Sequence, residues 1–378
     1  MKKIYEKVAR KIVLLSLVVL ISIISKGAIY YVSNAGNDSN SGLTVSLPWK
    51  SLNKVNISTF ASGDQILFQR GNIFIGSLAV QRSGLTYGAY GTGINPVISG
   101  FETISGWTDQ GGGVYRAKTT ATSSCNMVTV NGVNTPRGRY PDSGWLSFES
   151  FVGRTSITDA QLTSTPNWNG AEVVIKKNNW TIDRSLITNH TNSTITYTSG
   201  STNNPVSVYG NYSYFIQNHL GTLTTLGEWF CDGTYLYMYF GANSPNNYIV
   251  KASIIDNVIT IDSKNTITVS DLTVEGGNDY GVYVNLSANI SLSNCDIQFN
   301  GNTGIFGNSN TTFTIDGCMI NNNNGDGVYI TSTSTTLKNS TVDSSGMFPG
   351  MGASDGRSYR GVYIRSAGGL VEYNTISN

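Results

Sequence analysis

The sequence has few of the residue types on which catalytic triads and metal centres depend. Its 378 residues include two histidines and four cysteines, and 12% of its residues are charged. His190 and His219 occur without a Gly-x-Ser-x-Gly turn, which argues against a serine-hydrolase triad. The cysteines and histidines lack zinc-site spacing, and the chain has no phosphate-binding glycine loop. These absences leave carboxylates, arginines and aromatic residues as the candidates for chemistry.

A long apolar run is confined to the N-terminus. It covers residues 12–24 and follows five basic residues. This length is short for a bilayer span and is typical of a signal-peptide core. We predict a signal peptide over residues 1–27, with cleavage between Gly27 and Ala28 and secretion to the extracellular space, periplasm or cell surface. The alternative is an uncleaved N-terminal anchor.

The charge balance argues against a nucleic-acid partner. The whole chain has a net charge of +1, but residues 1–27 hold six Lys or Arg and one Glu, so the mature chain carries −4. Such a chain has no basic surface for nucleic acid. We also expect no stable membrane insertion after cleavage, and a monomer. The 42 glycines and 39% hydrophobic residues are typical of a turn-rich β protein with a large core.

A repeat organises residues 265–366. Gly281, Gly304 and Gly327 are spaced by 23 residues, and Gly361 follows after 34. Each glycine opens a short apolar strand in which inward and outward residues alternate. A fixed period of this length predicts a solenoid, in which stacked coils about 4.8 Å apart bury their apolar faces against one another.

This pattern resembles the right-handed parallel β-helix of pectate lyases, polygalacturonases and many secreted bacterial surface proteins. The resemblance implies an all-β fold. It implies less about function, because the same scaffold carries lyases, hydrolases and adhesins. Residues 28–56 resemble the opening of such proteins, and a short helix over residues 48–55 is expected to cap the solenoid with Trp49, Leu52 and Val55.

The coil period is lost between the first and last parts of the chain. We predict an N-terminal cap and first coils over residues 28–100, and an inserted β-rich domain, sandwich-like or barrel-like, over residues 101–256. Coils resume over residues 257–378, where the last one is incomplete. Residues 126–144 and 214–240 resemble segments of β-helix carbohydrate-active enzymes that carry an inserted β domain.

The four cysteines fall into two pairs. Cys295 and Cys318 occupy one column of the repeat, and their side chains run parallel, so we expect free thiols packed as small apolar groups. Cys125 and Cys231 both lie in the insert. In an oxidising compartment this second pair is as consistent with a disulfide as with two free thiols.

An outward-facing aromatic column marks the strands after the repeat glycines. It consists of Tyr283, Phe306, Tyr329 and Tyr363. Four aromatic residues on one face form an apolar strip against which sugar rings can lie, which predicts substrate binding. The alternative is that the column stabilises neighbouring coils, or that the insert packs on it.

Charged residues gather beside the fourth coil. Asp326 and Arg360 precede successive repeat glycines, and the long turn over residues 346–360 adds Asp355 and Arg357. Insertions of this kind are where function is usually grafted onto a solenoid. Residues 321–330 also look similar to the Gly-Asp-Gly turns of polygalacturonase-like β-helices. Arg365 points outward two residues beyond Tyr363.

Two chemistries fit these charged residues. A glycoside hydrolase needs two carboxylates, for which we predict Asp326 and Asp355, with Arg357 or Arg360 tuning a carboxylate or gripping an acidic sugar. A lyase needs a base and a cation beside the uronate, which Arg360 or Arg365 and a calcium ion on the two aspartates could supply. The structural alternative is an Asp/Arg surface ion pair.

The sequence thus predicts a secreted bacterial protein that acts on polysaccharides, as a glycoside hydrolase or a polysaccharide lyase. No cofactor is expected for a hydrolase, and calcium is expected only for a lyase. The alternative is a non-catalytic glycan-binding surface module or a structural adhesin.

Overall fold

The computed structural model describes residues 27–122, 124–176, 182–198, 213–352 and 359–377. The predicted signal segment up to residue 26 lies outside these ranges, as do the predicted site residues Asp355 and Arg357. Within these ranges, strands predominate, and no helix is long and apolar enough to cross a membrane.

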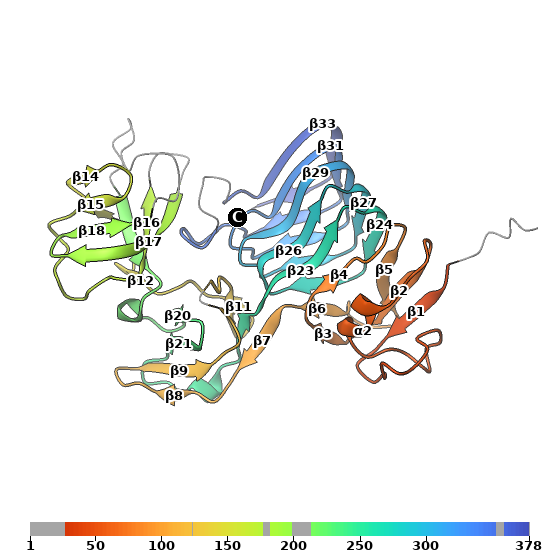
Figure 1. Cartoon of the computed structure of the whole chain (residues 1–378), viewed down its shortest axis with the longest axis horizontal. Coiled ribbons are helices and arrows are strands. Elements are labelled where there is room, and N and C mark those ends of the chain that lie inside the picture. The colour runs from red at the N-terminus through yellow and green to blue at the C-terminus, as the bar shows by residue number, and fades with distance from the viewer. Residues whose placement is uncertain (1–26, 123, 177–181, 199–212, 353–358, 378) are drawn as a thin grey trace, which may run out of the picture.

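Parallel strands stack in three columns to form a β-helix, which confirms the predicted all-β solenoid (Figure 1). The first column contains β4 (Leu78–Ala79), β23 (Ile255–Asp262) and β26 (Gly277–Asn285). The second contains β1 (Ile29–Val32), β2 (Gln65–Gln69), β5 (Thr86–Tyr90), β24 (Asn265–Ser270) and β27 (Ala288–Ser293). Both columns continue into the long strands β29 (Thr303–Asp316), β31 (Val328–Lys338) and β33 (Val362–Glu372). The third contains β3 (Ile73–Ile75), β6 (Val97–Ser99), β25 (Thr273–Glu275), β28 (Asp296–Gln298), β30 (Met319–Asn321), β32 (Thr341–Asp343) and β34 (Thr375–Ile376).

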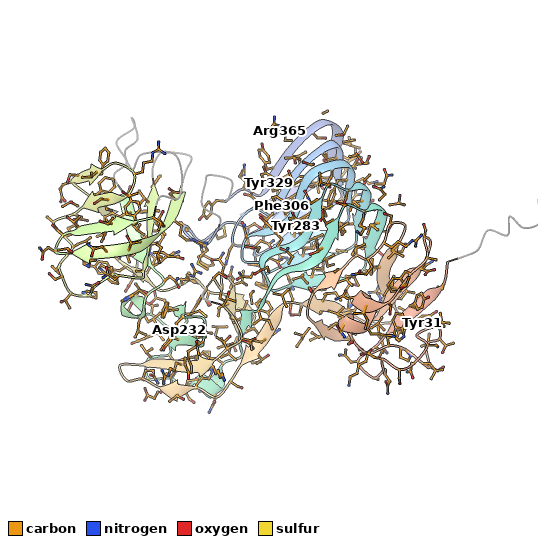
Figure 2. The ribbon with its side chains drawn as sticks, in the orientation of Figure 1. Tyr31, Asp232, Tyr283, Phe306, Tyr329 and Arg365 are labelled. Atoms are coloured by element: carbon orange, nitrogen blue, oxygen red, sulfur yellow. The ribbon has the colours of Figure 1, made fainter. Side chains whose placement is uncertain are left out.

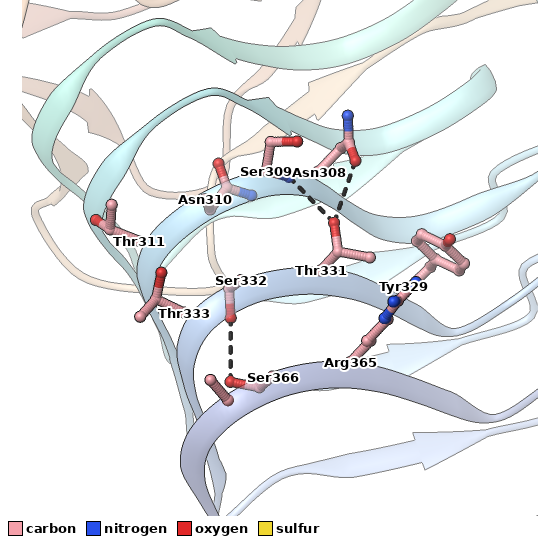
Figure 3. Close-up of a pocket in the computed structure, with 11 residues that line it drawn as sticks. Asn308, Ser309, Asn310, Thr311, Tyr329, Thr331, Ser332, Thr333, Arg365 and Ser366 are labelled. Carbon is pink, nitrogen blue, oxygen red and sulfur yellow. Dashed lines mark hydrogen bonds between the residues drawn. The ribbon is translucent and has the colours of Figure 1, made fainter.

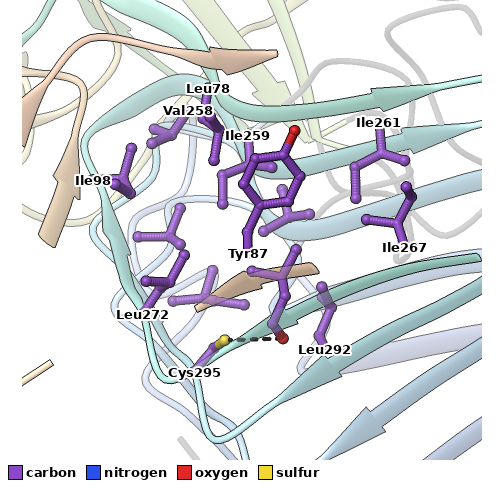
Figure 4. Packing of buried hydrophobic residues seen from close by; sticks show 14 of the residues in the cluster. Leu78, Tyr87, Ile98, Val258, Ile259, Ile261, Ile267, Leu272, Leu292 and Cys295 are labelled. Carbon is purple, nitrogen blue, oxygen red and sulfur yellow. Dashed lines mark hydrogen bonds between the residues drawn. The ribbon is translucent and has the colours of Figure 1, made fainter. Parts of the chain in front are cut away.

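The apolar columns of the repeat meet inside the coils and form one core. Figure 4 shows this packing around Tyr87, Ile259, Leu272 and Leu292, each at most 1% exposed. Because each coil places an aliphatic residue above that of the coil before it, the core runs the length of the solenoid. Stability therefore depends on the stack rather than on any single coil.

The repeat glycines are required by the close approach of successive coils. A Cβ atom on Gly304 would lie 2.8 Å from the carbonyl oxygen of Gly327 and 2.7 Å from Nδ2 of Asn323. Gly281 meets Gly304 and Asn300 at similar distances. A side chain at these positions would have to displace backbone, so the 23-residue spacing of glycine marks where the coil turns tightly.

The N-terminal cap covers the open end of the solenoid. Its helix, α2 (Leu52–Ile57), starts later than the predicted residue 48, because Ser51 is its N-cap and accepts a hydrogen bond from the first turn. Trp49, Leu52 and Val55 are buried against the first coils, as predicted.

The solenoid continues across the insertion. β23 pairs in parallel with β4, β24 with β5 and β25 with β6, so the coil after the insertion stacks directly on the coil before it. The chain leaves through β7 (Phe101–Ile104) and returns through β22 (Val250–Ser253), which pair antiparallel. The inserted region therefore emerges from one side of the β-helix.

The inserted region consists of antiparallel sheets around two hydrophobic clusters. One cluster surrounds Trp229 and the other surrounds Trp168, and both side chains are at most 1% exposed. The first sheet joins β7 and β22 to β10 (Val128–Val130) and β11 (Val133–Asn134), and the second contains β8 (Thr108–Asp109), β9 (Val114–Lys118), β20 (Trp229–Cys231) and β21 (Tyr235–Tyr239). The third contains β12 (Arg139–Tyr140), β13 (Leu146–Ser147), β14 (Ser150–Val152), β15 (Ser156–Thr158), β16 (Glu172–Lys176), β17 (Ile182–Thr191), β18 (Thr194–Tyr197) and β19 (Ser213–Gln217). Two short 3-10 helices, η1 (Leu220–Thr222) and η2 (Pro245–Asn247), lie in loops of the inserted region.

All four cysteines are buried free thiols. Cys295 and Cys318 stack on neighbouring coils, as expected. Cys125 and Cys231, for which a disulfide was an open alternative, are also unbridged. Burial and the neighbouring Cys231 raise the pKa of Cys125 to about 12, so this thiol stays protonated at neutral pH.

Candidate functional site

The predicted aromatic column forms a continuous stack on the outer face of the coils. The ring centroids of Tyr283 and Phe306 lie 5.6 Å apart, those of Phe306 and Tyr329 5.2 Å, and those of Tyr329 and Tyr363 4.8 Å. The ring planes differ by 4°, 7° and 16° in the same order, which is offset stacking. Tyr280 extends the stack, with its centroid 4.6 Å from Phe306.

Neighbouring rings in this stack cover part of each other's faces. All four predicted residues are half-buried, and Figure 2 shows Tyr283, Phe306 and Tyr329 in a column on the side that faces the inserted region. The rings of neighbouring coils are therefore in contact, as expected if the column stabilises the stacking of the coils. The substrate-binding role of the column stays a prediction.

Asp326 and Arg360 form a bidentate ion pair. Nη2 of Arg360 lies 2.8 Å from Oδ2 of Asp326, and its Nε lies 3.2 Å from Oδ1. The backbone N–H of Arg360 also donates to Oδ1 at 2.9 Å. Asp326 is 1% exposed, whereas the Arg360 side chain is 31% exposed and packs on the rings of Tyr329 and Tyr363. The geometry matches the ion-pair alternative, and the predicted catalytic roles of both residues stay untested.

The long turn of the fourth coil contacts the inserted region. Met351 packs into the hydrophobic cluster of Trp229. The carbonyl oxygen of Gly350 accepts hydrogen bonds from Nη1 of Arg184 at 3.0 Å and Nε2 of Gln217 at 2.9 Å. The described part of this turn therefore holds the inserted region against the coils. Asp355 and Arg357 lie in the part that is not described.

A cleft of about 340 Å³ lies where the inserted region, the coils and this turn meet. It is lined by Ser124, Asn126, Arg184, Asp256, Asn278, Asp279, Asn302 and Gly352. The first three residues come from the inserted region and Gly352 from the turn, while the remaining four come from the coils. Side chains that are distant in sequence thus converge on one open, polar cavity.

Two carboxylates face this cleft from adjacent coils. Asp256 lies in β23 and Asp279 in β26, at a register shift that places Asp256 opposite Asn278 and Asp279. Nδ2 of Asn278 lies 3.4 Å from Oδ1 of Asp256. Among the described residues, no hydrogen bond to the Asp279 carboxyl is found. The two carboxyl groups therefore have different environments.

The pKa of Asp279 is raised from its ordinary value. The main cause is desolvation within the cleft, and the negative charge of Asp256 adds to it, while Arg184 opposes both. The side chain is exposed to solvent, and the groups around it still make the charged carboxylate less favourable than it is in water. A carboxyl of raised pKa beside a second carboxylate is the arrangement used for acid catalysis.

Arg184 is held at the cleft by a buried network. Its Nη1 donates to Oδ1 of Asn126 at 3.0 Å, and its Nε lies 3.8 Å from Oε2 of Glu172. That same oxygen accepts from Arg137 at 2.8 Å and from Gln217 at 2.8 Å. Burial alone would raise the pKa of Glu172, but the two arginines outweigh it and lower that pKa. An ionised Glu172 therefore keeps both arginines in place.

Sequence reasoning did not identify the Asp256–Asp279 pair. The two residues are 23 positions apart, which is one coil period, and this spacing was the available signal. Asp256 was instead assigned to the end of the insert, so the two aspartates were not recognised as neighbours.

The remaining predicted residue is Arg365, which is exposed. It follows Tyr363 by two residues, so it lies on the side of the aromatic stack away from the cleft. With Tyr329 it lines an open groove of about 790 Å³ on the outer face of β29, β31 and β33 (Figure 3). Among the described residues, no group of three or more His, Cys, Asp or Glu side chains is placed to hold a metal ion. The calcium expected for a lyase stays a prediction.

Comparisons with known proteins identify the fold. A family model for the right handed beta helix region matches residues 230–376. A solved structure described as "Glycoside hydrolase" aligns with 85% of this chain and 74% of its own, at 16% identity and a TM-score of 0.64. The complex of XylC with xylose aligns with 92% of this chain and 58% of its own, at 13% identity and a TM-score of 0.54. No curated protein is similar enough in sequence to count as a relative. The chain is thus a right-handed parallel β-helix.

Proposed function

We propose that this is a secreted polysaccharide-active protein that hydrolyses glycosidic bonds in the cleft between the inserted region and the coils. The observation that carries the proposal is the pair of aspartates on adjacent coils, one of which has a raised pKa. The structural likeness to a glycoside hydrolase and to a xylose complex supports a carbohydrate substrate, although at 16% and 13% identity the likeness itself concerns the fold.

Hydrolysis needs one carboxyl group to donate a proton and a second that remains ionised. Asp279, with its raised pKa, donates its proton to the glycosidic oxygen as the bond to the leaving sugar breaks. Asp256 is proposed as the second carboxyl group of the pair. Arg184 and the amide of Asn302 lie around the pair and can bind sugar hydroxyl groups.

The spacing of the coils favours a retaining mechanism. Neighbouring strands lie about 4.8 Å apart, close to the roughly 5–5.5 Å between carboxyl groups in retaining enzymes. Asp256 then attacks the anomeric carbon and forms a glycosyl-enzyme ester. In the second step Asp279 takes a proton from water, and this water cleaves the ester and releases the sugar with its original configuration.

The test is a panel of neutral and acidic polysaccharides, assayed for new reducing ends and for the ultraviolet absorbance of unsaturated uronates. The wild type is expected to release reducing ends without absorbance on at least one substrate. Asp279→Asn and Asp256→Asn are each expected to lower the rate by about 100-fold or more. Asp109→Asn, exposed on β8 of the inserted region and lining neither the cleft nor the groove on the outer face, is the control and should retain full activity.

Other outcomes point to other functions. Absorbance growth would establish a lyase and overturn the hydrolase proposal. If Asp326→Asn loses activity and the cleft variants do not, the active site is at the Asp326–Arg360 pair and not in the cleft. If the protein cleaves none of the substrates but still binds glycans, the result would favour a non-catalytic glycan-binding module.

A further inference from the structure

The groove that Arg365 lines is separate from the cleft. It is formed by Asn308, Ser309, Asn310, Thr311, Tyr329, Thr331, Ser332, Thr333, Arg365, Ser366 and Ala367, at the bend of three successive long strands. None of these residues lines the cleft that holds Asp256 and Asp279. Amides and hydroxyls dominate its surface, and Tyr329 gives it one aromatic edge.

A hydrogen-bonded column of polar side chains leads to Arg365. Nδ2 of Asn285 donates to Asp262 at 3.0 Å, Nδ2 of Asn308 donates to Asn285 at 3.3 Å, and Oγ1 of Thr331 donates to Asn308 at 3.1 Å. Arg365 is the next residue in this column, since it pairs in register with Thr331. The column runs beside the aromatic stack, two residues further along each strand, so it shares the outward face.

Arg365 is the sole charged residue among the described residues that line the groove. Its side chain is exposed, and no hydrogen bond or ion pair to another described residue holds the guanidinium. Figure 3 shows the side chain directed toward Tyr329 across the groove. A guanidinium exposed in a polar groove is suited to bidentate binding of a carboxylate or sulfate group.

We infer that this groove binds an acidic oligosaccharide, with Arg365 pairing with its anionic group and the Asn, Ser and Thr side chains bonding its hydroxyls. Donors and acceptors recur from coil to coil at intervals of about 4.8 Å, which suits a ligand that itself repeats. Nucleic acid fits less well, because the described lining of the groove contains a single cation and the whole chain has a net charge of only +1.

The inference rests on the proposed function only for the class of ligand. Because the groove and the cleft share no residue, binding in the groove does not require that Asp256 and Asp279 be catalytic. Within the proposed function, the groove would hold an acidic chain while the cleft cleaves it.

Binding to the full chain is measured by calorimetry with oligogalacturonate, a sulfated oligosaccharide and a neutral oligosaccharide of equal length. The wild type is expected to prefer at least one acidic ligand over the neutral one, and to bind it more weakly as salt rises. Arg365→Ala is expected to weaken that binding by about tenfold or more, the effect of one charge-assisted hydrogen bond. Arg365→Lys should restore part of it. Lys118→Ala removes an exposed positive charge on the inserted region and should leave the affinity unchanged.

The inference is overturned if no acidic ligand is preferred, if Arg365→Ala binds like the wild type, or if single-stranded DNA competes equally well. Thr331→Val, which preserves shape and removes a hydroxyl, is a second test and should weaken binding by a few fold. Asp279→Asn should bind normally. If the wild type binds the acidic ligand but hydrolyses no substrate, the proposed reaction is rejected and the inference that the groove binds an acidic oligosaccharide still holds.

Discussion

At the scale of single residues, three aspartates illustrate how environment determines role. Asp326 is 1% exposed and bonded on both oxygens by Arg360, so its carboxylate is already occupied. Asp256 and Asp279 are exposed in the cleft. The sequence predicted a catalytic role for Asp326 because it precedes a repeat glycine beside a long turn. The repeat spacing also placed Arg360 beside Asp326 and left an ion pair between them as the alternative, and the structure shows that ion pair.

The raised pKa of Asp279 depends in part on Asp256. Asp256→Asn removes a nearby negative charge, so the pKa of Asp279 is expected to fall toward its ordinary value without reaching it, since desolvation is the larger cause. The measurement is a titration of the Asp279 carboxyl carbon by NMR in both proteins. An unchanged pKa would show that the two carboxyl groups do not interact. Asp262→Asn is the matched control and should leave the titration unaffected.

Glu172 stabilises the fold by compensating two arginines. Glu172→Gln leaves Arg137, whose side chain is 1% exposed, without its partner and should lower the free energy of unfolding by about 3–5 kcal/mol. Because the pKa of Glu172 is lowered in the folded state, its contribution is present above the unfolded pKa and is lost as the pH falls through the folded one. Chemical denaturation at several pH values measures both effects.

An exposed ion pair provides a control for the loss of stability expected in Glu172→Gln. Asp316 and Lys338 form an ion pair at 3.3 Å with both side chains about one-third exposed, so Asp316→Asn should cost about 1 kcal/mol or less. If the two variants are equally stable, the buried network does not hold the inserted region as described.

At the scale of elements, the repeat was the most informative part of the sequence. Its period predicted the coils, the inward columns and the outward aromatic stack, because strand side chains alternate strictly between faces. It did not predict the docking of the long turn. That turn meets Arg184 across 166 residues of chain, and no local pattern encodes such a contact.

The tight turn at each repeat glycine predicts a position-specific effect of alanine. Gly304→Ala places a Cβ against the backbone of the next coil and should destabilise the protein by about 1–3 kcal/mol. Gly368→Ala meets open space, with no atom within 4 Å, and should change stability by less than about 0.5 kcal/mol. Thermal unfolding of both variants measures the difference. Equal effects would contradict the packing argument.

Buried thiols predict slow chemical modification. In the native protein none of the four cysteines should react readily with a thiol reagent, and all four should react after unfolding without a reductant. Two reactive thiols after unfolding would indicate a Cys125–Cys231 disulfide, the alternative that the sequence left open.

At the scale of the whole molecule, the inserted region and the solenoid together build the cleft. The coils supply Asp256, Asn278 and Asp279, and the inserted region supplies Asn126 and Arg184. The sequence predicted both parts separately. Where they meet is set by contacts such as those of Gly350 and Met351, which become apparent only in three dimensions.

The most direct test of the proposed reaction compares substrates with poor and good leaving groups. Once the polysaccharide panel identifies the released sugar, its activated aryl glycoside needs little help from a general acid, whereas the polysaccharide needs protonation. Asp279→Asn should cleave the aryl glycoside at a rate close to that of the wild type and fail on the polysaccharide. Asp256→Asn should fail on both. If Asp279→Asn cleaves both substrates like the wild type, the cleft is not the active site.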